Sequence, residues 1–290
     1  MSDDFRPRRS VLYMPAANAK ALEKAKTIPA DALIFDLEDA VAPDAKPAAR
    51  ESAAAAASSG EYGRRELTIR CNGLDTPWGA DDLAAAAAAG PAAVVIPKVS
   101  STAYLADVVR RLEAAGAPDS LRVWAMIETP TAIFDVRQIA AVDRVAVLVM
   151  GNNDLVKELR ARQVPGRVPI LGHLATAVLA AREAGKVILD GVFNDITNAE
   201  GFEAECRQGA EMGFDGKTLI HPGQVDVANT VWAPSEAEID EARQIIEAFA
   251  QAEAEGKGVV TVNGRMVENL HRDTARRTLA VADAIAALAA

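Results

Sequence analysis

Two carboxylates stand out because each follows a short apolar segment. Glu128 comes directly after Val123–Ile127, and Asp154 follows Ala146–Met150 after a short polar loop. In a parallel α/β fold the chemistry gathers at one end of the strands, so acids in matching positions are predicted to lie close together. With no Cys or His nearby in sequence, the pair suits a hard, oxygen-preferring cation such as Mg²⁺. The structural alternative is that each acid only caps the helix that follows it.

Further charged residues end other apolar segments. Glu38 and Asp39 follow the second segment together with Asp36, and Arg70 closes the third. So many acids at the same end of the predicted strands repel one another unless a cation neutralises them. We interpret Glu38 and Asp39 as acceptors for water around the metal, because Mg²⁺ usually keeps several waters.

Arg70 and one loop are predicted to orient a substrate. Arg70 offers two parallel donors to a carbonyl or carboxylate oxygen, although a structural salt bridge to the acids of the second segment is an alternative. The loop residues Gly151, Asn152 and Asn153 precede a predicted helix, so their N–H groups are expected to hold a substrate carboxylate.

The elements that must position these residues form a repeating pattern. Segments of helical composition separate eight short apolar segments, Ser10–Met14, Ala32–Leu37, Leu67–Cys71, Ala93–Pro97, Val123–Ile127, Val145–Met150, Val187–Val192 and Lys217–Ile220. Such non-alternating apolar segments are typical of strands buried on both faces. Eight alternations of strand and helix predict an α/β fold of the (β/α)₈ TIM-barrel type, and 290 residues fit one barrel plus an extension.

The predicted catalytic barrel covers residues 1–233, and a C-terminal extension covers residues 234–290. Ser235 is the predicted cap of a helix that runs to about Glu255, where Gly256–Gly258 break it. A short strand, Val259–Val262, then leads into Asn263-Gly264, a hairpin-type turn, and a last helix runs from Leu270 to Ala289. The extension either closes the barrel end or reaches a neighbouring subunit.

Composition excludes several classes of protein. The 31 Lys and Arg residues face 41 Asp and Glu, and a formal charge of −10 argues against a nucleic-acid surface. The two cysteines, Cys71 and Cys206, lack metal-type spacing and favour a reducing cytoplasm. The N-terminus has no apolar signal segment, and the apolar stretch Ala84–Ile96 is too short to span a membrane. We therefore expect a cytoplasmic protein without a membrane partner.

Several ordered motifs carry a family resemblance. They are Arg9–Pro15, Phe35–Val41, Arg70–Trp78, Ile96–Lys98, Gly213–Lys217 and Ile220–Pro222. Together they resemble the citrate lyase beta subunit-like proteins of the HpcH/HpaI aldolase superfamily, and the likeness covers nearly the whole chain. The resemblance implies a TIM barrel, Mg²⁺ held by Glu128 and Asp154, and substrate contact by Arg70 and Glu128. It also implies a homo-oligomer, a trimer or hexamer, and a hydroxyacyl-CoA thioester substrate such as malyl-CoA or citramalyl-CoA.

Candidate residues for contact with coenzyme A are chosen only by their positive charge. Three lysines that would meet its phosphates are Lys20, Lys98 and Lys217. A surface lysine is more often simply solvated, so each of the three has a structural alternative.

The chemistry implied by the resemblance is cleavage of a C–C bond to an α-keto acid and an acyl-CoA enolate, with Arg70 beside the developing oxyanion. In the family lyases an aspartate in the C-terminal extension of an adjacent subunit protonates the enolate. Here Glu268 stands at that position, and Glu268–His271 looks like the (3S)-malyl-CoA thioesterase branch, in which the thioester is hydrolysed to malate and CoA. An extra methylene displaces the carboxyl, which matters for a positioned proton donor. The sequence leaves lyase and thioesterase open.

Other functions remain as alternatives. One is a non-autonomous beta subunit of a citrate lyase complex that acts on an acyl-carrier-protein thioester. Another is a metal- and CoA-binding protein without turnover, which the intact acid set disfavours. The aldolases of the wider superfamily are a weaker alternative, because their His/Arg motif is not evident in this chain.

Overall fold

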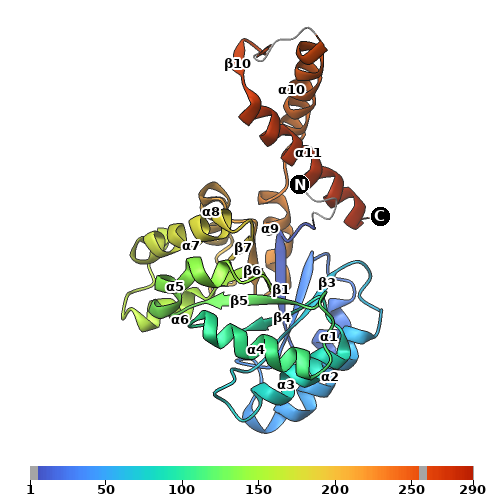
Figure 1. Cartoon of the computed structure of the whole chain (residues 1–290), viewed down its shortest axis with the longest axis vertical. Coiled ribbons are helices and arrows are strands. Elements are labelled where there is room, and N and C mark those ends of the chain that lie inside the picture. The colour runs from blue at the N-terminus through green and yellow to red at the C-terminus, as the bar shows by residue number, and fades with distance from the viewer. Residues whose placement is uncertain (1–5, 255–259, 290) are drawn as a thin grey trace. The chain divides into compact units, whose positions relative to one another are not determined.

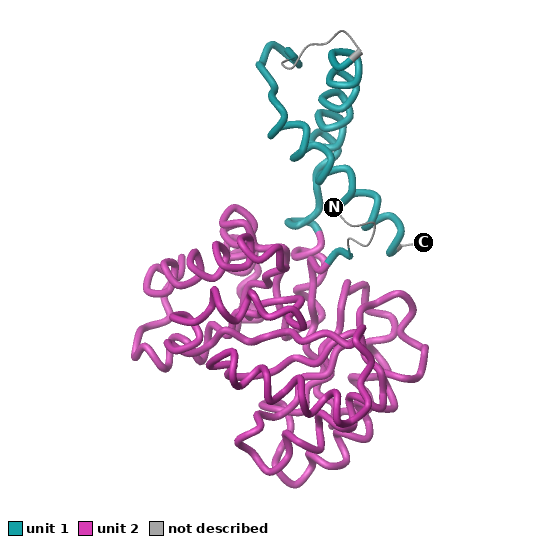
Figure 2. Tube along the Cα trace, in the orientation of Figure 1, with its two compact units in different colours: residues 1–7, 230–290 teal, residues 8–229 magenta. Residues whose placement is uncertain are grey.

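The computed structural model describes residues 6–254 and 260–289, and the chain divides into two compact units. One unit is Arg8–Asn229, and the other is Thr230–Ala290 with the residues before Arg8 (Figure 2). The predicted break at Gly256–Gly258 and the predicted strand residue Val259 lie outside the described residues.

The larger unit is a closed parallel barrel of eight strands taken in sequence order, and it confirms the predicted (β/α)₈ fold (Figure 1). The strands are β1 (Ser10–Pro15), β2 (Ala32–Asp36), β3 (Glu66–Arg70), β4 (Ala93–Ile96), β5 (Arg122–Ile127), β6 (Val145–Met150), β7 (Val187–Asp190) and β8 (Gly216–Leu219). Each strand pairs with the next, and β1 pairs with β8 to close the barrel. This register places Asp36 of β2 directly beside Arg70 of β3.

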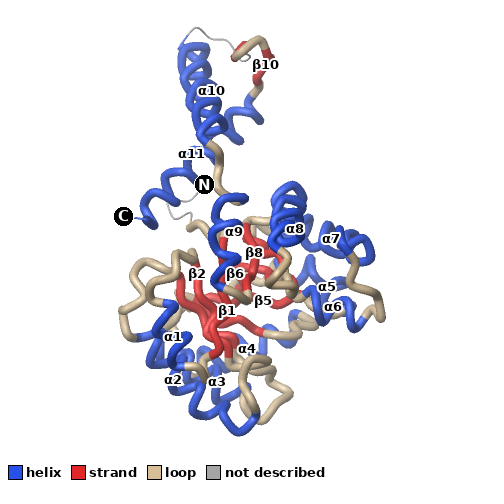
Figure 3. Tube along the Cα trace, turned by 180° about the vertical axis from the view of Figure 1, so that it is seen from behind, coloured by secondary structure: helices blue, strands red, loops and turns tan. Residues whose placement is uncertain are grey.

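Helices surround the strands, as Figure 3 shows from the opposite side. They are α1 (Ala19–Ala25), α2 (Lys46–Ser58), α3 (Gly79–Ala89), α4 (Thr102–Ala114), α5 (Pro130–Ala140), α6 (Asn152–Glu158), α7 (Leu171–Glu183), α8 (Ala199–Met212) and α9 (Val225–Val231), with the 3₁₀ turns η1 (Pro43–Ala45), η2 (Pro165–Ile170) and η3 (Pro222–Gln224). Local sequence explains their ends. Ser101 and Thr129 accept N-cap hydrogen bonds from backbone N–H groups of α4 and α5, and Gly90 ends α3 in the left-handed conformation.

The barrel interior is a packed core of strand side chains. Val11, Ile34, Trp124 and Val147 are fully buried and belong to one apolar cluster that draws on six of the eight strands. Because the interior is filled, the functional groups must stand at the ends of the strands. Across the described residues, no helix is long and apolar enough to cross a membrane.

The C-terminal unit contains two long helices and a hairpin. They are α10 (Glu236–Ala254), β9 (Val260–Val262), β10 (Arg265–Val267) and α11 (Asn269–Ala289). Ser235 and Glu238 form a reciprocal cap at the start of α10. Asn263 and Gly264 both have positive φ, as a type I′ hairpin turn requires. Phe249 packs with the hairpin in a small apolar cluster and lies beneath the guanidinium of Arg272.

Candidate active site

A cavity of about 350 Å³ lies at the C-terminal ends of the barrel strands. Seven of the predicted site residues line it, namely Asp39, Arg70, Glu128, Gly151, Asn152, Asn153 and Asp154. The remaining lining residues include Tyr13, Asp36, Met126 and Thr218. The lining residues end or follow seven of the eight strands, all except β4.

Arg70 is held by the carboxylates of the second strand. Its Nε and Nη2 donate to the two oxygens of Asp36 at 2.6 and 2.7 Å. Its Nη1 lies 2.8 Å from Glu38 and 3.4 Å from Asp39. The two parallel donors that were predicted to face a substrate are thus occupied by Asp36, which is the salt bridge named above as the alternative. Burial lowers the pKa of Arg70, but the combined effects of Asp36, Tyr13 and Glu38 raise it well above its usual value, so the guanidinium stays charged.

A buried lysine fixes the loop that carries these acids. The Nζ of Lys46 donates to the carbonyl oxygens of Leu37 and Glu38 and to the side-chain oxygen of Asn72. Asn72 in turn donates to Asp82 at the start of α3. The loop after β2 is therefore tied to α2 and to the following β3–α3 unit, and its acids are held around Arg70.

Glu128 is almost completely buried, and within the described part of the chain it accepts one hydrogen bond. The backbone N–H of Lys98 donates to its Oε1 at 2.6 Å, and Lys98 adopts a positive φ of 49° in doing so. Burial raises the pKa of Glu128 from 4.5 to about 7; the Lys98 N–H lowers it, and the charges of Glu38 and Asp154 raise it further. A carboxylate in this environment gains from a neighbouring cation.

Gly151 permits the close approach of β6 to Glu128. A Cβ atom at position 151 would come within 2.3 Å of the Oε2 atom of Glu128, so no larger residue fits without a shift. The N–H of Gly151 donates to Ile127, which joins the ends of β5 and β6. Asp154 follows in the first turn of α6, so the two predicted metal ligands come from neighbouring strand ends.

The donor set around the cavity fits a hard cation with few protein ligands. No group of three or more His, Cys, Asp or Glu side chains among residues 6–254 and 260–289 is spaced to hold a metal ion. Glu128 and Asp154 contribute two carboxylate groups to the lining of the cavity. Mg²⁺ is commonly bound in this way, through one or two carboxylates with water and substrate oxygens in the other positions.

The sequence profile of the HpcH/HpaI aldolase/citrate lyase family matches residues 9–222, which include the whole barrel. The chain belongs to this family. The resemblance inferred from the motifs is therefore confirmed.

Individual relatives in this family match the chain over nearly its full length. A (3S)-malyl-CoA thioesterase of Cereibacter sphaeroides is 50% identical over 290 residues, covering 100% of both chains. Citrate lyase subunit beta of Escherichia coli is 38% identical, covering 96% of this chain and 94% of the relative. The crystal structure of CitE from Mycobacterium tuberculosis in complex with magnesium, acetoacetate and coenzyme A has a TM-score of 0.77 at 31% identity, covering 96% and 98%. These relatives are enzymes of the hydrolase and lyase types that the sequence predicted.

A second cavity of about 520 Å³ borders the first and shares Asn152, Asn153, Val192 and Asn194 with it. Its base is a buried ionic network in which Asp190 accepts from Arg167 and Lys217. Asp190 and Lys217 are paired within this network, whereas the Nη2 of Arg167 has no hydrogen-bond partner among the described residues. Glu128 and Asp154 do not line this cavity. We therefore place the chemistry in the smaller cavity.

The three lysines proposed for coenzyme A lie in different environments. Lys217 is fully buried, and its Nζ is 2.9 Å from Asp190 and 2.7 Å from Glu205. It has no access to a phosphate, so its assignment as a CoA contact is corrected to a structural role. Lys20 is exposed in the first turn of α1. Lys98 extends a half-exposed side chain toward Glu38, at 3.4 Å.

Two cavity residues were not assigned a role from sequence. Asp36 was seen only as one of three acids, and its pairing with Arg70 became visible with the strand register. Tyr13 gave no signal, because an aromatic residue at the end of an apolar strand is usually part of the core.

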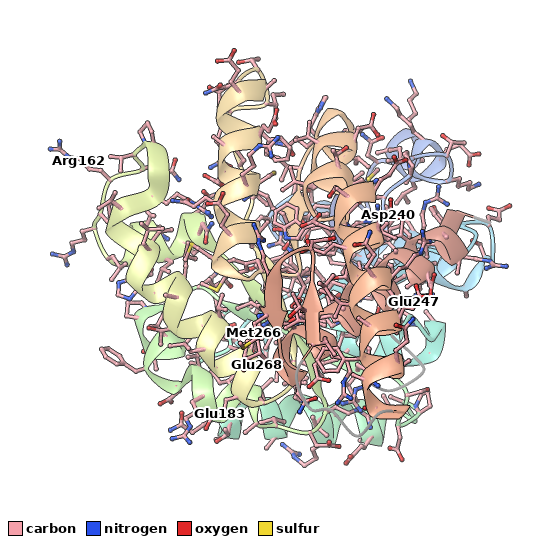
Figure 4. All side chains as sticks on the ribbon, turned by 90° about the horizontal axis from the view of Figure 1, so that it is seen from above. Arg162, Glu183, Asp240, Glu247, Met266 and Glu268 are labelled. Carbon is pink, nitrogen blue, oxygen red and sulfur yellow. The ribbon has the colours of Figure 1, made fainter. Side chains whose placement is uncertain are left out.

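Glu268 lies in the C-terminal unit, where its side chain is exposed and its N–H donates to His271 (Figure 4).

Replacing Lys217 by Met tests the structural role assigned to this lysine. We expect Lys217→Met to lower the free energy of unfolding by about 3 kcal/mol, because it removes one of the two cations that pair with the buried carboxylate of Asp190 and leaves part of that charge uncompensated. Urea unfolding followed by tryptophan fluorescence measures the change. The matched control, Lys20→Met on the exposed surface, should stay within about 0.5 kcal/mol of wild type. Unchanged stability of Lys217→Met together with weaker CoA binding would reverse this assignment.

Proposed function

We propose that this protein is a Mg²⁺-dependent enzyme acting on 3-hydroxyacyl-CoA thioesters, and that it hydrolyses (3S)-malyl-CoA to malate and CoA. The observation that carries the proposal is the full-length 50% identity to (3S)-malyl-CoA thioesterases. The cavity supports it, because the paired acids Glu128 and Asp154 stand beside Arg70 in a space of about 350 Å³.

Glu128 and Asp154 are the proposed ligands of the metal. Bound there, Mg²⁺ would supply Lewis-acid polarisation of the substrate's hydroxyl and neighbouring carboxylate oxygens. Glu38 and Asp39 are proposed to accept hydrogen bonds from water around the cation. The first N–H groups of α6, from Asn152 and Asn153, have no backbone acceptor within their helix and are proposed donors to the substrate carboxylate.

Arg70 is proposed to face the thioester group. Its Nε and one N–H of Nη2 donate to Asp36, and its Nη1 donates to Asp39 and forms an ion pair with Glu38, so the second N–H of Nη2 is proposed for a substrate oxygen. The buried carboxylates hold the guanidinium in place, so this donor is oriented before the substrate binds. Such preorganised charge stabilises an oxyanion without a cost of reorganisation during the reaction.

Glu268 is the proposed proton-transfer group. In hydrolysis its carboxylate removes a proton from water as the water oxygen bonds to the thioester carbon. The C–S bond then breaks, and the CoA thiolate leaves and is protonated. We propose that Glu268 acts in the cavity of an adjacent copy of the chain, because its exposed side chain belongs to a unit separate from the barrel.

Cleavage of the C–C bond is the second candidate. The 38% identity to citrate lyase subunit beta over 284 residues favours it. In this reaction the substrate hydroxyl loses a proton, the C–C bond breaks to an α-keto acid and an acyl-CoA enolate, and Glu268 protonates the enolate carbon. The same metal ligands and Arg70 serve both reactions, so Glu268 and the access of water decide between them.

The oligomeric state, the contacts to coenzyme A and the cellular compartment are also proposals. A homo-oligomer is proposed from the role given to Glu268, and a trimer or hexamer from the family resemblance. Lys20 and Lys98 remain the proposed contacts to coenzyme A phosphates. Cys71 and Cys206 are both buried free thiols, which fits a reducing cytoplasm.

Product analysis on (3S)-malyl-CoA separates these functions. With Mg²⁺ we expect malate and free CoA in equal amounts, detected by thiol titration and chromatography, and loss of the activity when EDTA removes the metal. Glyoxylate with acetyl-CoA would instead assign the lyase reaction. Turnover of the free CoA thioester by the isolated chain excludes an obligatory acyl-carrier-protein partner. If neither malyl-CoA nor citramalyl-CoA reacts, the proposed function is wrong.

Mixed oligomers test whether Glu268 serves a neighbouring subunit. Glu128→Gln and Glu268→Gln should each be inactive, because one lacks a metal ligand and the other the proton-transfer group. If sites combine residues from two copies, co-expressed variants regain about a quarter of wild-type activity in randomly mixed oligomers. Separate affinity tags allow the mixed species to be isolated, and Glu268→Gln alone should bind Mg²⁺ as wild type does. Mixed oligomers that remain inactive would contradict a shared site.

A further inference from the structure

Tyr13 is the aromatic side chain of the cavity, and its ring covers Arg70. It ends up next to the acids because it lies on β1, paired with β2 through Ile34. The guanidinium carbon of Arg70 is 4.8 Å from the ring centroid, which is a cation–π distance. Tyr13 lines the cavity together with Glu128 and Asp154.

The hydroxyl of Tyr13 is available to a ligand. Within the described residues it forms no hydrogen bond with another protein group, whereas the hydroxyls of Tyr62 and Tyr104 are bonded to Leu22 and Leu74. Burial raises the pKa of Tyr13, so the hydroxyl keeps its proton at neutral pH and acts as a neutral donor. A phenolic O–H in a largely buried site usually has a partner, and here the cavity is where that partner would be.

Arg70 by itself gives the cavity too few donors for an oxyanion. Asp36 accepts from Nε and from one N–H of Nη2, while Nη1 donates to Asp39 and forms an ion pair with Glu38. One N–H remains, while sites that stabilise a developing oxyanion generally aim two or more donors at it. The missing donor must come from a neighbouring group that no carboxylate already occupies.

We propose that the Tyr13 hydroxyl is this second donor, and that it contacts the thioester carbonyl oxygen beside the free N–H of Arg70. This inference rests on the proposed function. In hydrolysis, water adds to the carbonyl carbon and the carbonyl oxygen becomes an oxyanion. Tyr13 donates a hydrogen bond to that oxygen without giving up its proton, and the bond weakens again when the C–S bond breaks. In C–C cleavage the same oxygen is the enolate oxygen, so the role is unchanged.

A purely structural role for Tyr13 predicts different behaviour. If the ring served only as a platform for Arg70, phenylalanine would replace it without loss, because the ring face that covers the guanidinium is kept. If the hydroxyl contacts the substrate, Tyr13→Phe removes the donor and leaves the platform intact. Tyr13→Leu removes both, which separates the two contributions.

The experiment compares Tyr13→Phe with Tyr62→Phe on (3S)-malyl-CoA at saturating Mg²⁺. Tyr62 is a matched control, since its hydroxyl donates to the Leu22 carbonyl at 3.1 Å and it does not line the cavity. For Tyr13→Phe we expect kcat and kcat/KM to fall together by about 10²-fold, as for loss of one oxyanion donor. KM and the Mg²⁺ affinity measured by calorimetry should stay within about twofold of wild type. Tyr62→Phe should keep the wild-type kcat.

Two results would overturn the proposal while leaving the function intact. One is an active wild type with Tyr13→Phe turning over at the same rate. The other is a Tyr13→Phe protein that loses Mg²⁺ affinity in proportion to activity, which would assign Tyr13 to site structure alone. A wild type inactive on malyl-CoA and citramalyl-CoA would instead remove the proposed function, and this inference with it.

Discussion

The site depends on the ion pair between Asp36 and Arg70, which the parallel register of β2 and β3 places side by side. Both oxygens of Asp36 bind the guanidinium, so Arg70 cannot rotate freely toward solvent. Breaking such a buried pair leaves an uncompensated charge at a cost of about 3–5 kcal/mol, which keeps the arrangement intact. The orientation of the remaining Arg70 donor and of the Tyr13 ring follows from this one contact.

Glu128 is the acid that this arrangement does not satisfy. Arg70 is engaged by the acids of the β2 end, and Lys98 supplies Glu128 with a backbone N–H while its ammonium group lies near Glu38. Burial raises the pKa of Glu128, and the charges of Glu38 and Asp154 raise it further, so the ionised carboxylate is disfavoured. A divalent cation between Glu128 and Asp154 would stabilise the ionised form, which connects the electrostatics of the barrel end with the proposed chemistry. The acids that line the cavity outnumber its bases, and the proposed cation would offset this excess of negative charge.

The barrel was predictable because β-strands buried on both faces give unbroken apolar segments, as in Val145–Met150. Residues that stand at strand ends, such as Glu128, Arg70 and Asp154, were found for the same reason. Roles that depend on packing were not predictable. Lys217 and Lys20 look alike in sequence, yet only Lys217 lies inside a buried ionic network. That Asp36 occupies two N–H donors of Arg70 is known only once the register of β2 and β3 is known. The role proposed for Tyr13 depends on the same register.

Proton-linked Mg²⁺ binding tests the central claim, that Glu128 is a buried metal ligand whose charge a cation stabilises. Because its pKa is raised to about 7, Glu128 carries a proton below that pH, and Mg²⁺ must displace it. Calorimetric titrations should show the apparent association constant rising about tenfold per pH unit below pH 7 and levelling off above it, with proton release at low pH. Glu128→Gln should lose the binding. A wild-type affinity that does not change between about pH 6 and pH 8, or Mg²⁺ binding that survives in Glu128→Gln, would contradict the account.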